Sequence, residues 1–182
     1  YVDQVAQGLD TKPSCRLATT ANLSASYSNG TAGVGATLTA SSNGALSIDG
    51  VTPSASDRIL VKDQSTAAQN GIYVVTTQGD GSTAFVLTRA TPEDQPAELS
   101  GGSFVFVEEG TANGDNGYVF THTGQPTFGT TALDVTQFSG AGQITAGAAL
   151  SKSGNQMDVE VDNSSIEVNA DALRVKALGV TN

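Results

Sequence analysis

The chain has 182 residues and a formal net charge of −10, and 14% of its residues are charged, against about 25% in a typical soluble domain. An acidic surface repels phosphate groups, which argues against nucleic acid and anionic membranes as partners. No stretch approaches about 18 apolar residues, so the sequence predicts no membrane insertion. The single cysteine, Cys15, excludes an internal disulfide bond.

Residues 1–12 form the first predicted element, a short amphipathic helix. Val2, Val5 and Leu9 recur at the spacing of one helical face, and Pro13 follows its end. Two turns of helix are too short to be stable alone, so we expect this helix to contact its copies in two other chains. The chain does not begin with Met, and we expect the natural protein to extend beyond both ends.

Residues 13–138 predict a globular β domain, either an antiparallel sandwich or a small barrel. The chain is rich in glycine and β-branched residues and has repeated Asn-Gly and Asp-Gly turns, which favours strands. Within this domain, residues 36–49 are expected to form a hairpin around an Asn-Gly turn. Leu38 then lies on its first arm, and Leu46 and Ile48 lie on its second.

The domain contains two related halves, at about 58–90 and 103–138. RILVKD in the first half parallels FVFVEE in the second, and NGIYV parallels NGYVF, each at an offset of 46 residues. Each half predicts a strand, a polar loop, an Asn-Gly pair and a second strand, followed by a third strand. We therefore expect segments 59–75 and 105–121 to superpose, with positive φ at the glycine of each Asn-Gly pair.

Residues 139–182 combine a Gly-rich linker with a 16-residue repeat, in which LSKSGNQMDVEV (150–161) is followed by IEVNADALRVKA (166–177). Each copy predicts one or two very short strands and a tight turn. Such a unit cannot bury its own apolar face, and two copies are too few for a solenoid within one chain.

Three chains wound around one axis would bury these apolar faces. The sequence therefore predicts an intertwined trimeric β shaft and a homotrimer. The predicted trimer contacts are Val2, Val5, Leu9, Leu150, Met157, Ile166 and Leu173.

The chain offers few groups for catalysis or metal binding. His122 is the only histidine, and no nucleophile or orienting acid is placed beside it by the sequence. A zinc site built from histidine and cysteine is excluded by their scarcity. We predict that the protein is not an enzyme and needs no cofactor.

Two carboxylate-rich segments provide the remaining candidate sites. The first is a candidate calcium site in an oxygen-rich loop, although its spacing is not that of an EF-hand and a solvated acidic loop is the favoured interpretation. The second, TPEDQPAELSGG at 91–102, is expected to be a solvated surface loop and not a glycosidase pair. The residues are Glu108, Glu109, Asn113, Asp115 and Asn116 in the first and Glu93, Asp94 and Glu98 in the second. An exposed aromatic that could contact a glycan is expected at Phe128, which lies in a Gly/Thr/Pro loop.

Several segments, which together span nearly the whole chain, carry a family resemblance. They are YVDQVAQGLDTKPSCRLATTANL, IDGVTPSASDRILVKDQSTAAQNGIYVV, LTRATPED, SGGSFVFVEEGTANGDNGYVFT and QFSGAGQITAGAALSKSGNQMDVEV. They resemble tail-fibre-type structural proteins of tailed bacteriophages, with cyanobacterial and other environmental phages the most similar. DRILVKDQ…NGIYVV and GAGQIT…L…GN are the most specific parts. The resemblance implies an elongated, homotrimeric virion appendage used in host attachment, and it implies no catalytic residues.

The favoured hypothesis is therefore a fibre component, serving as a spacer or as a receptor-binding part. It would be located in the virion tail fibre and become extracellular on release. Its partners would be its own copies, other virion tail proteins and a host surface glycan. The alternatives are a capsid or tail decoration protein, a carbohydrate-binding surface adhesin module, and a polysaccharide-degrading tailspike. A tailspike normally needs a long β-helix and a carboxylate cleft, for which this chain is too short.

Overall fold

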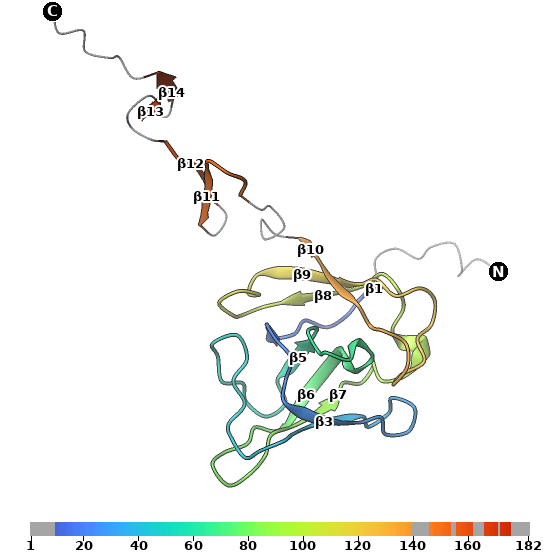
Figure 1. The fold of residues 1–182 in the computed structure, drawn as a ribbon. Coiled ribbons are helices and arrows are strands. Elements are labelled where there is room, and N and C mark those ends of the chain that lie inside the picture. Colours follow the sequence, from blue (N-terminus) through green and yellow to red (C-terminus); the bar gives the residue numbers. More distant parts are fainter. Residues whose placement is uncertain (1–9, 140–145, 154–155, 162–165, 171, 176–182) are drawn as a thin grey trace, which may run out of the picture. The chain divides into compact units, whose positions relative to one another are not determined.

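The structure is a computed structural model that describes residues 10–139, 146–153, 156–161, 166–170 and 172–175. It is mainly β, as the sequence predicts, and the helices in the described residues are two 3-10 turns, η1 (Ala67–Gln69) and η2 (Pro96–Glu98). The chain divides after Ser139 into two units (Figure 1). The first unit contains a six-stranded and a four-stranded sheet, and the second contains two hairpins.

Of the residues predicted to form the N-terminal helix, the structure describes only 10–12. Residues 1–9, with Val2, Val5 and Leu9, lie outside the described residues. Asp10–Thr11 form strand β1, so the helix prediction is wrong at this point. The backbone there is extended because β1 pairs with a strand of the four-stranded sheet.

The six-stranded sheet has the order β2-β5-β6-β7-β4-β3. Its first pair is parallel and the others are antiparallel. The strands are β2 (Leu17–Ala18), β3 (Ala25–Ser28), β4 (Thr37–Ala40), β5 (Arg58–Val61), β6 (Gly71–Thr77) and β7 (Val86–Arg89).

This sheet is buried on both faces. Leu60 joins an apolar cluster shared with the four-stranded sheet, whereas its neighbours Ile59 and Val61 join a second cluster on the opposite face. Leu46 and Ile48 belong to the second cluster and come from the segment after β4. Burial on both faces explains why β5 is an unbroken apolar run after Arg58.

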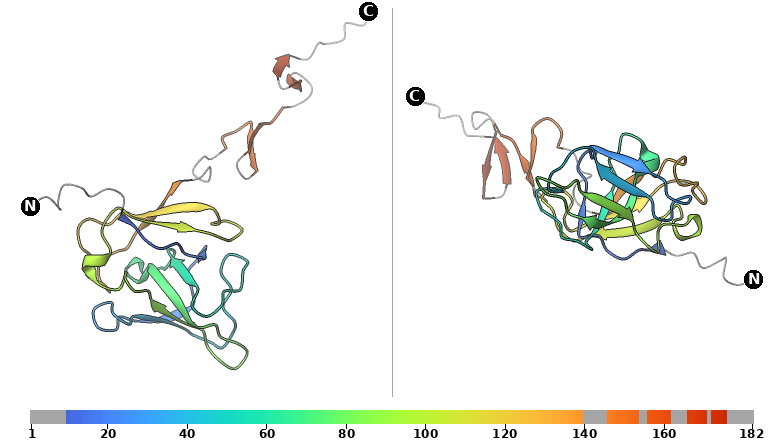
Figure 2. Two further views of the ribbon diagram at one scale, coloured as in Figure 1. Left: turned by 180° about the vertical axis from the view of Figure 1, so that it is seen from behind. Right: turned by 90° about the horizontal axis from the view of Figure 1, so that it is seen from below.

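The four-stranded sheet has the order β1-β8-β9-β10. Its strands after β1 are β8 (Ser103–Val107), β9 (Asn116–Phe120) and β10 (Val135–Ser139). β1 is parallel to β8, and the remaining pairs are antiparallel. This sheet lies against one face of the six-stranded sheet, as both the front and the rear views show (Figure 1 and Figure 2).

The segment from Asp10 to Thr19 connects the two sheets. Lys12 N donates to Phe104 O of β8 at 2.7 Å, and Thr19 N donates to Leu60 O of β5 at 2.9 Å. The Asp10 side chain holds the start of this segment by accepting a 2.7 Å hydrogen bond from Ser103 Oγ. Burial alone would raise the pKa of Asp10, but hydrogen bonds from Lys12 and Ser103 outweigh it and hold that pKa below its ordinary value.

The hairpin predicted over 36–49 is wrong, although its apolar residues are buried as expected. Leu38 of β4 pairs with Tyr27 of β3 on one side and with Leu87 of β7 on the other. Leu46 N instead donates to Gln78 O. β4 is an interior strand of the sheet and pairs with β3 and β7. These two strands therefore take the place of the predicted second arm at Leu46 and Ile48.

The two halves of the domain share an order of strands but not a register. β5 and β6 are joined by a loop at 62–70, and β8 and β9 by a loop at 108–115, which is one residue shorter. Ile59 pairs with Tyr73, whereas Val105 pairs with Tyr118. A one-residue change of register turns a strand's side chains to the other face, so the expected superposition of 59–75 on 105–121 fails for β8 against β5.

The two Asn-Gly pairs also differ. Gly71 has the predicted positive φ, at 142°. Gly117 instead lies within the extended strand β9, where it pairs with Phe106, so the prediction of a positive-φ turn there is wrong.

Candidate functional site

The C-terminal repeats form two hairpins with the same register. In the first, β11 (Leu150–Ser153) pairs with β12 (Gln156–Val159), and Leu150 lies opposite Val159. In the second, β13 (Ile166–Asn169) pairs with β14 (Ala172–Val175), and Ile166 lies opposite Val175. Every bound is displaced by 16 residues, which confirms the predicted short strands.

Each hairpin exposes apolar side chains on one side, which in the first hairpin also carries Lys152 opposite Met157. Cross-strand partners project on the same side of a hairpin, as do alternate residues along one strand. The exposed fractions are 41% for Leu150, 43% for Val159, 47% for Ile166, 53% for Val168, 55% for Leu173 and 80% for Val175. The opposite side of the second hairpin is polar, with an ion pair of 2.7 Å between Arg174 and Glu167.

These faces contain the predicted trimer contacts that the structure describes. Leu150, Met157, Ile166 and Leu173 all lie on them, with Met157 half-buried. An isolated two-stranded hairpin is marginally stable at best in water and needs a further apolar surface to pack against. We therefore treat the two faces as a candidate self-association site.

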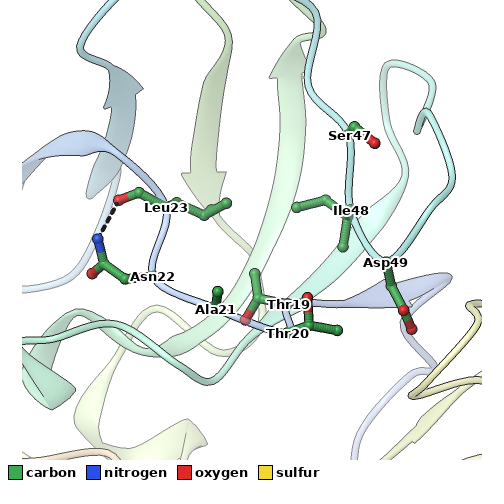
Figure 3. A pocket seen from close by; sticks show the side chains of 8 residues that line it. All are labelled: Thr19, Thr20, Ala21, Asn22, Leu23, Ser47, Ile48 and Asp49. Atoms are coloured by element: carbon green, nitrogen blue, oxygen red, sulfur yellow. Dashed lines mark hydrogen bonds between the residues drawn. The ribbon is translucent and has the colours of Figure 1, made fainter.

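A pocket of about 200 Å³ lies in the first unit beside the segment that follows β2 (Figure 3). Its lining residues are Thr19, Thr20, Ala21, Asn22, Leu23, Ser47, Ile48 and Asp49. The Asn22 amide oxygen accepts from Ser65 N at 2.8 Å, and the Asp49 carboxylate accepts from Asn113 N at 2.8 Å. The amide oxygen and the carboxylate of the pocket are thus engaged with the protein's own backbone.

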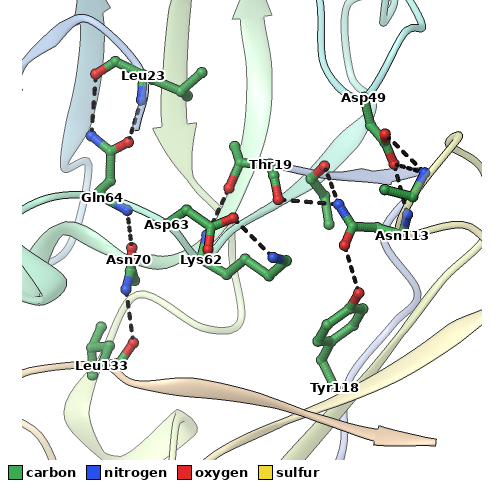
Figure 4. Close-up of polar contacts among 12 residues, drawn as sticks. Thr19, Leu23, Asp49, Lys62, Asp63, Gln64, Asn70, Asn113, Tyr118 and Leu133 are labelled. Carbon is green, nitrogen blue, oxygen red and sulfur yellow. Dashed lines mark hydrogen bonds and ion pairs between the residues drawn. The ribbon is translucent and has the colours of Figure 1, made fainter. Parts of the chain in front are cut away.

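Two buried asparagines attach loops to the sandwich (Figure 4). Asn113 donates to the carbonyl oxygens of Ala18 and Thr19 at 3.1 Å and accepts from the Tyr118 hydroxyl at 2.6 Å. Burial raises the pKa of Tyr118 to about 12, so the hydroxyl remains a donor at neutral pH. Asn70 donates to Leu133 O at 3.1 Å in a similar way.

The acidic loop of the candidate calcium site is bound to its own domain. Glu109 pairs with Arg16 at 3.2 Å, and Glu108 accepts a hydrogen bond from Ser14. Asn116 accepts from the Gln137 side chain at 2.8 Å. Asp115 lies at a turn with a positive φ of 58°. Within the described part of the chain, no group of three or more histidine, cysteine or acidic residues could hold a metal ion.

The carboxylates expected in a solvated loop are partly buried, and that prediction is wrong for two of them. Glu93 is fully buried and pairs with Arg58 Nη2 at 2.9 Å, and Asp94 is 6% exposed. Glu98 is partly exposed and ends η2, where its carboxylate accepts from Gln95 N, just before the start of that turn. A fully buried Glu93 could not reach a polysaccharide.

Phe128 is also buried, at 3% exposure, so the prediction that it is an exposed aromatic is wrong. Its ring lies under the guanidinium of Arg89, whose Cζ is 4.5 Å from the ring centroid. Arg89 donates to Asn70 O at 3.2 Å and to the Tyr73 hydroxyl at 3.0 Å. The Phe128 ring thus helps to enclose a buried cation.

Two further reactive groups are enclosed. His122 is 8% exposed, and its Nε2 lies 3.4 Å from Leu99 O. Cys15 is fully buried, and this burial raises the pKa of its thiol to about 12. A thiol held neutral and away from solvent is not a nucleophile at neutral pH.

The exposed aromatic residues of the four-stranded sheet were not predicted from the sequence. Phe106 is 40% exposed and Phe138 is 63% exposed. Unbroken apolar runs at β5 and β8 were visible in the sequence, but only the pairing register decides which phenylalanines face outwards.

No helix within the described residues is long and apolar enough to cross a membrane. In comparisons with known proteins, no family model, no curated protein and no solved structure matches the chain.

Proposed function

We propose that this chain is a structural component of a phage tail fibre that assembles as a homotrimer and serves host attachment as a spacer or receptor-binding part. The observation that carries the proposal is the pair of C-terminal hairpins, which share one register and expose one apolar face each. Three chains around a common axis would give each hairpin the apolar neighbours that it lacks within one chain. The resemblance of the sequence to tail-fibre-type proteins supports the same assignment.

The enclosed polar groups of the first unit support a structural role and not a catalytic one. Glu93 and Arg58 neutralise each other within the sandwich, and Arg89 lies between the rings of Phe128 and Tyr73. Buried charges that are paired in this way contribute to the structure of a domain, and they are withheld from substrates.

Two experiments test the proposal. Light scattering of the purified full chain is expected to give three times the mass of one chain. Antibody labelling of intact phage particles, viewed by electron microscopy, is expected to place the protein on the tail fibres. A monomeric protein would contradict the assembly, and labelling confined to the capsid would favour a decoration protein.

A further inference from the structure

The four-stranded sheet turns an apolar surface towards solvent. Phe104 lies opposite Val119, so both project on the same side. Phe106 follows two residues later on β8 and is 40% exposed. The Phe138 ring, 63% exposed, meets the Phe104 ring edge-on with a centroid separation of 5.8 Å. We call the surface formed by Phe104, Phe106, Val119 and Phe138 the phenylalanine face.

The burial of β5 and the composition of β8 indicate that the phenylalanine face is covered in the assembled protein. In β5, the residues on both sides of the strand are fully buried, as at Ile59 and Leu60. In β8, Val105 is fully buried on the inner side, but Phe106 on the outer side is not. An antiparallel sheet with one face in water normally carries polar residues on that face. Phenylalanine at both outer positions of β8 is typical of a buried surface.

The chemistry of the phenylalanine face fits an apolar partner. The row of cross-strand partners through Phe104 and Val119 ends in Thr11 and Thr136, which lie on the same side of the sheet. Neither these residues nor the phenylalanines carry charge, and a phenylalanine ring has no polar group with which to orient a sugar. Each copy of the chain has a net charge of −10, so copies repel one another less at an uncharged surface than elsewhere.

In the proposed trimer, the short connection to the hairpins would keep the sandwich units of neighbouring copies close together. Ser139 ends β10 and Leu150 begins β11, so the intervening chain spans at most about 40 Å when fully extended. If three sets of hairpins share an axis, the three sandwich units are tethered at effective concentrations of order millimolar. Weak apolar contacts between them are favoured at such concentrations.

We propose that the phenylalanine face is the contact between the sandwich units of neighbouring copies. This inference rests on the proposed homotrimer and adds a second interface to the hairpins. In a cyclic trimer, only residues near the axis meet their own copies. The proposal therefore places the phenylalanine face at the axis, with Phe138 of one copy close to Phe138 of the next.

Cysteine cross-linking in the full chain tests this contact. Phe138→Cys and Thr136→Cys each place a thiol on the phenylalanine face, and the second keeps all of its phenylalanines. Ala55→Cys places a thiol at an exposed turn before β5 and is the matched control. Native Cys15 does not compete, because it is fully buried. Under mild oxidation, covalent dimers are expected to form about tenfold faster or more for the face variants than for the control, since a disulfide needs Cα atoms within about 7 Å.

Light scattering on the same samples separates the two proposals. A trimer with fast cross-linking at residue 136 or 138 supports the contact. A trimer in which both face variants cross-link no faster than Ala55→Cys overturns this inference and leaves the trimeric fibre standing. A monomer overturns both proposals. A monomer whose face cysteines also resist alkylation would show that the chain covers this surface itself.

Discussion

At the scale of single residues, the space beside Gly71 is filled by a cation. A β-carbon at Gly71 would lie 2.1 Å from Arg89 Nη1, and the backbone φ of 142° is unfavourable for other residues. Gly71→Ala is therefore expected to lower the free energy of unfolding by about 3 kcal/mol through strain and displacement of Arg89.

Gly81→Ala is the matched control for this substitution, because nothing lies within 4 Å of its β-carbon position. Its effect is expected to stay within about 0.5 kcal/mol. Urea unfolding of both variants checks the difference. Equal losses would mean that the guanidinium does not need the glycine.

The ion pair between Arg58 and Glu93 gives a second prediction at this scale. Glu93→Gln leaves the Arg58 guanidinium without its charged partner inside the sandwich, and breaking a buried pair in this way costs about 3 kcal/mol or more. Glu109→Gln removes the exposed partner of Arg16 and is expected to have a much smaller effect, because water screens that pair. The denaturant midpoints of the two variants measure these losses of stability. A loss for Glu109→Gln that equals the loss for Glu93→Gln would argue against burial as the cause.

The thiol of Cys15 predicts a loss of stability in alkaline solution. Its pKa is raised by burial to about 12 from an ordinary value of 9.0, so the folded chain keeps the proton and the unfolded chain releases it. Stability is fully present below pH 9 and falls by about 1.4 kcal/mol per pH unit between pH 9 and 12. In Cys15→Ala, the free energy of unfolding is expected to fall less steeply with pH between pH 9 and 12, by that amount per pH unit. An unchanged slope would contradict the assignment.

At the scale of elements, the two faces of the second hairpin have different expected roles. Leu173 lies on the apolar face, whereas Arg174 projects to the opposite side, where it pairs with Glu167. Leu173→Asp is expected to dissociate the trimer or loosen the C-terminal hairpins, because it puts a charge into each of three contacts. Arg174→Ser is expected to leave assembly intact. Light scattering, together with limited proteolysis of residues after 139, measures both, and the sandwich should remain resistant. Equal sensitivity of the two variants would argue against a directional contact.

The same elements show what sequence can and cannot predict. The hairpins were predictable because their pairing is local and repeats at a fixed spacing. The pairing of β4 was not, since Leu38 finds Leu87 far along the chain and not the nearby Leu46. A loop shorter by one residue likewise turns Phe106 outwards, and composition carries no trace of that change. Glu93 was assigned to solvent because its partner, Arg58, lies 35 residues earlier.

At the scale of the whole molecule, the proposed assembly would bring together three strongly acidic chains. Each has a net charge of −10, so their association is opposed by repulsion that salt screens: the Debye length falls from about 30 Å at 0.01 M to about 8 Å at 0.15 M. The trimer is therefore expected to dissociate at higher protein concentrations in low salt than in physiological salt. Sedimentation at several salt concentrations measures this. Weaker association at 0.15 M would indicate an interface held by opposite charges.

The four-stranded sheet also determines how the sandwich unit would bear tension. The chain enters this sheet along one edge strand, β1, and leaves it along the other, β10. β1 is parallel to β8, and two antiparallel pairings lead from β8 to β10, so β1 and β10 run in the same direction. A pull on Asp10 and Ser139 therefore acts at opposite ends of the sheet and along its strands. The hydrogen bonds between strands would be sheared together and not opened one at a time, which would suit a unit that transmits force along the proposed fibre.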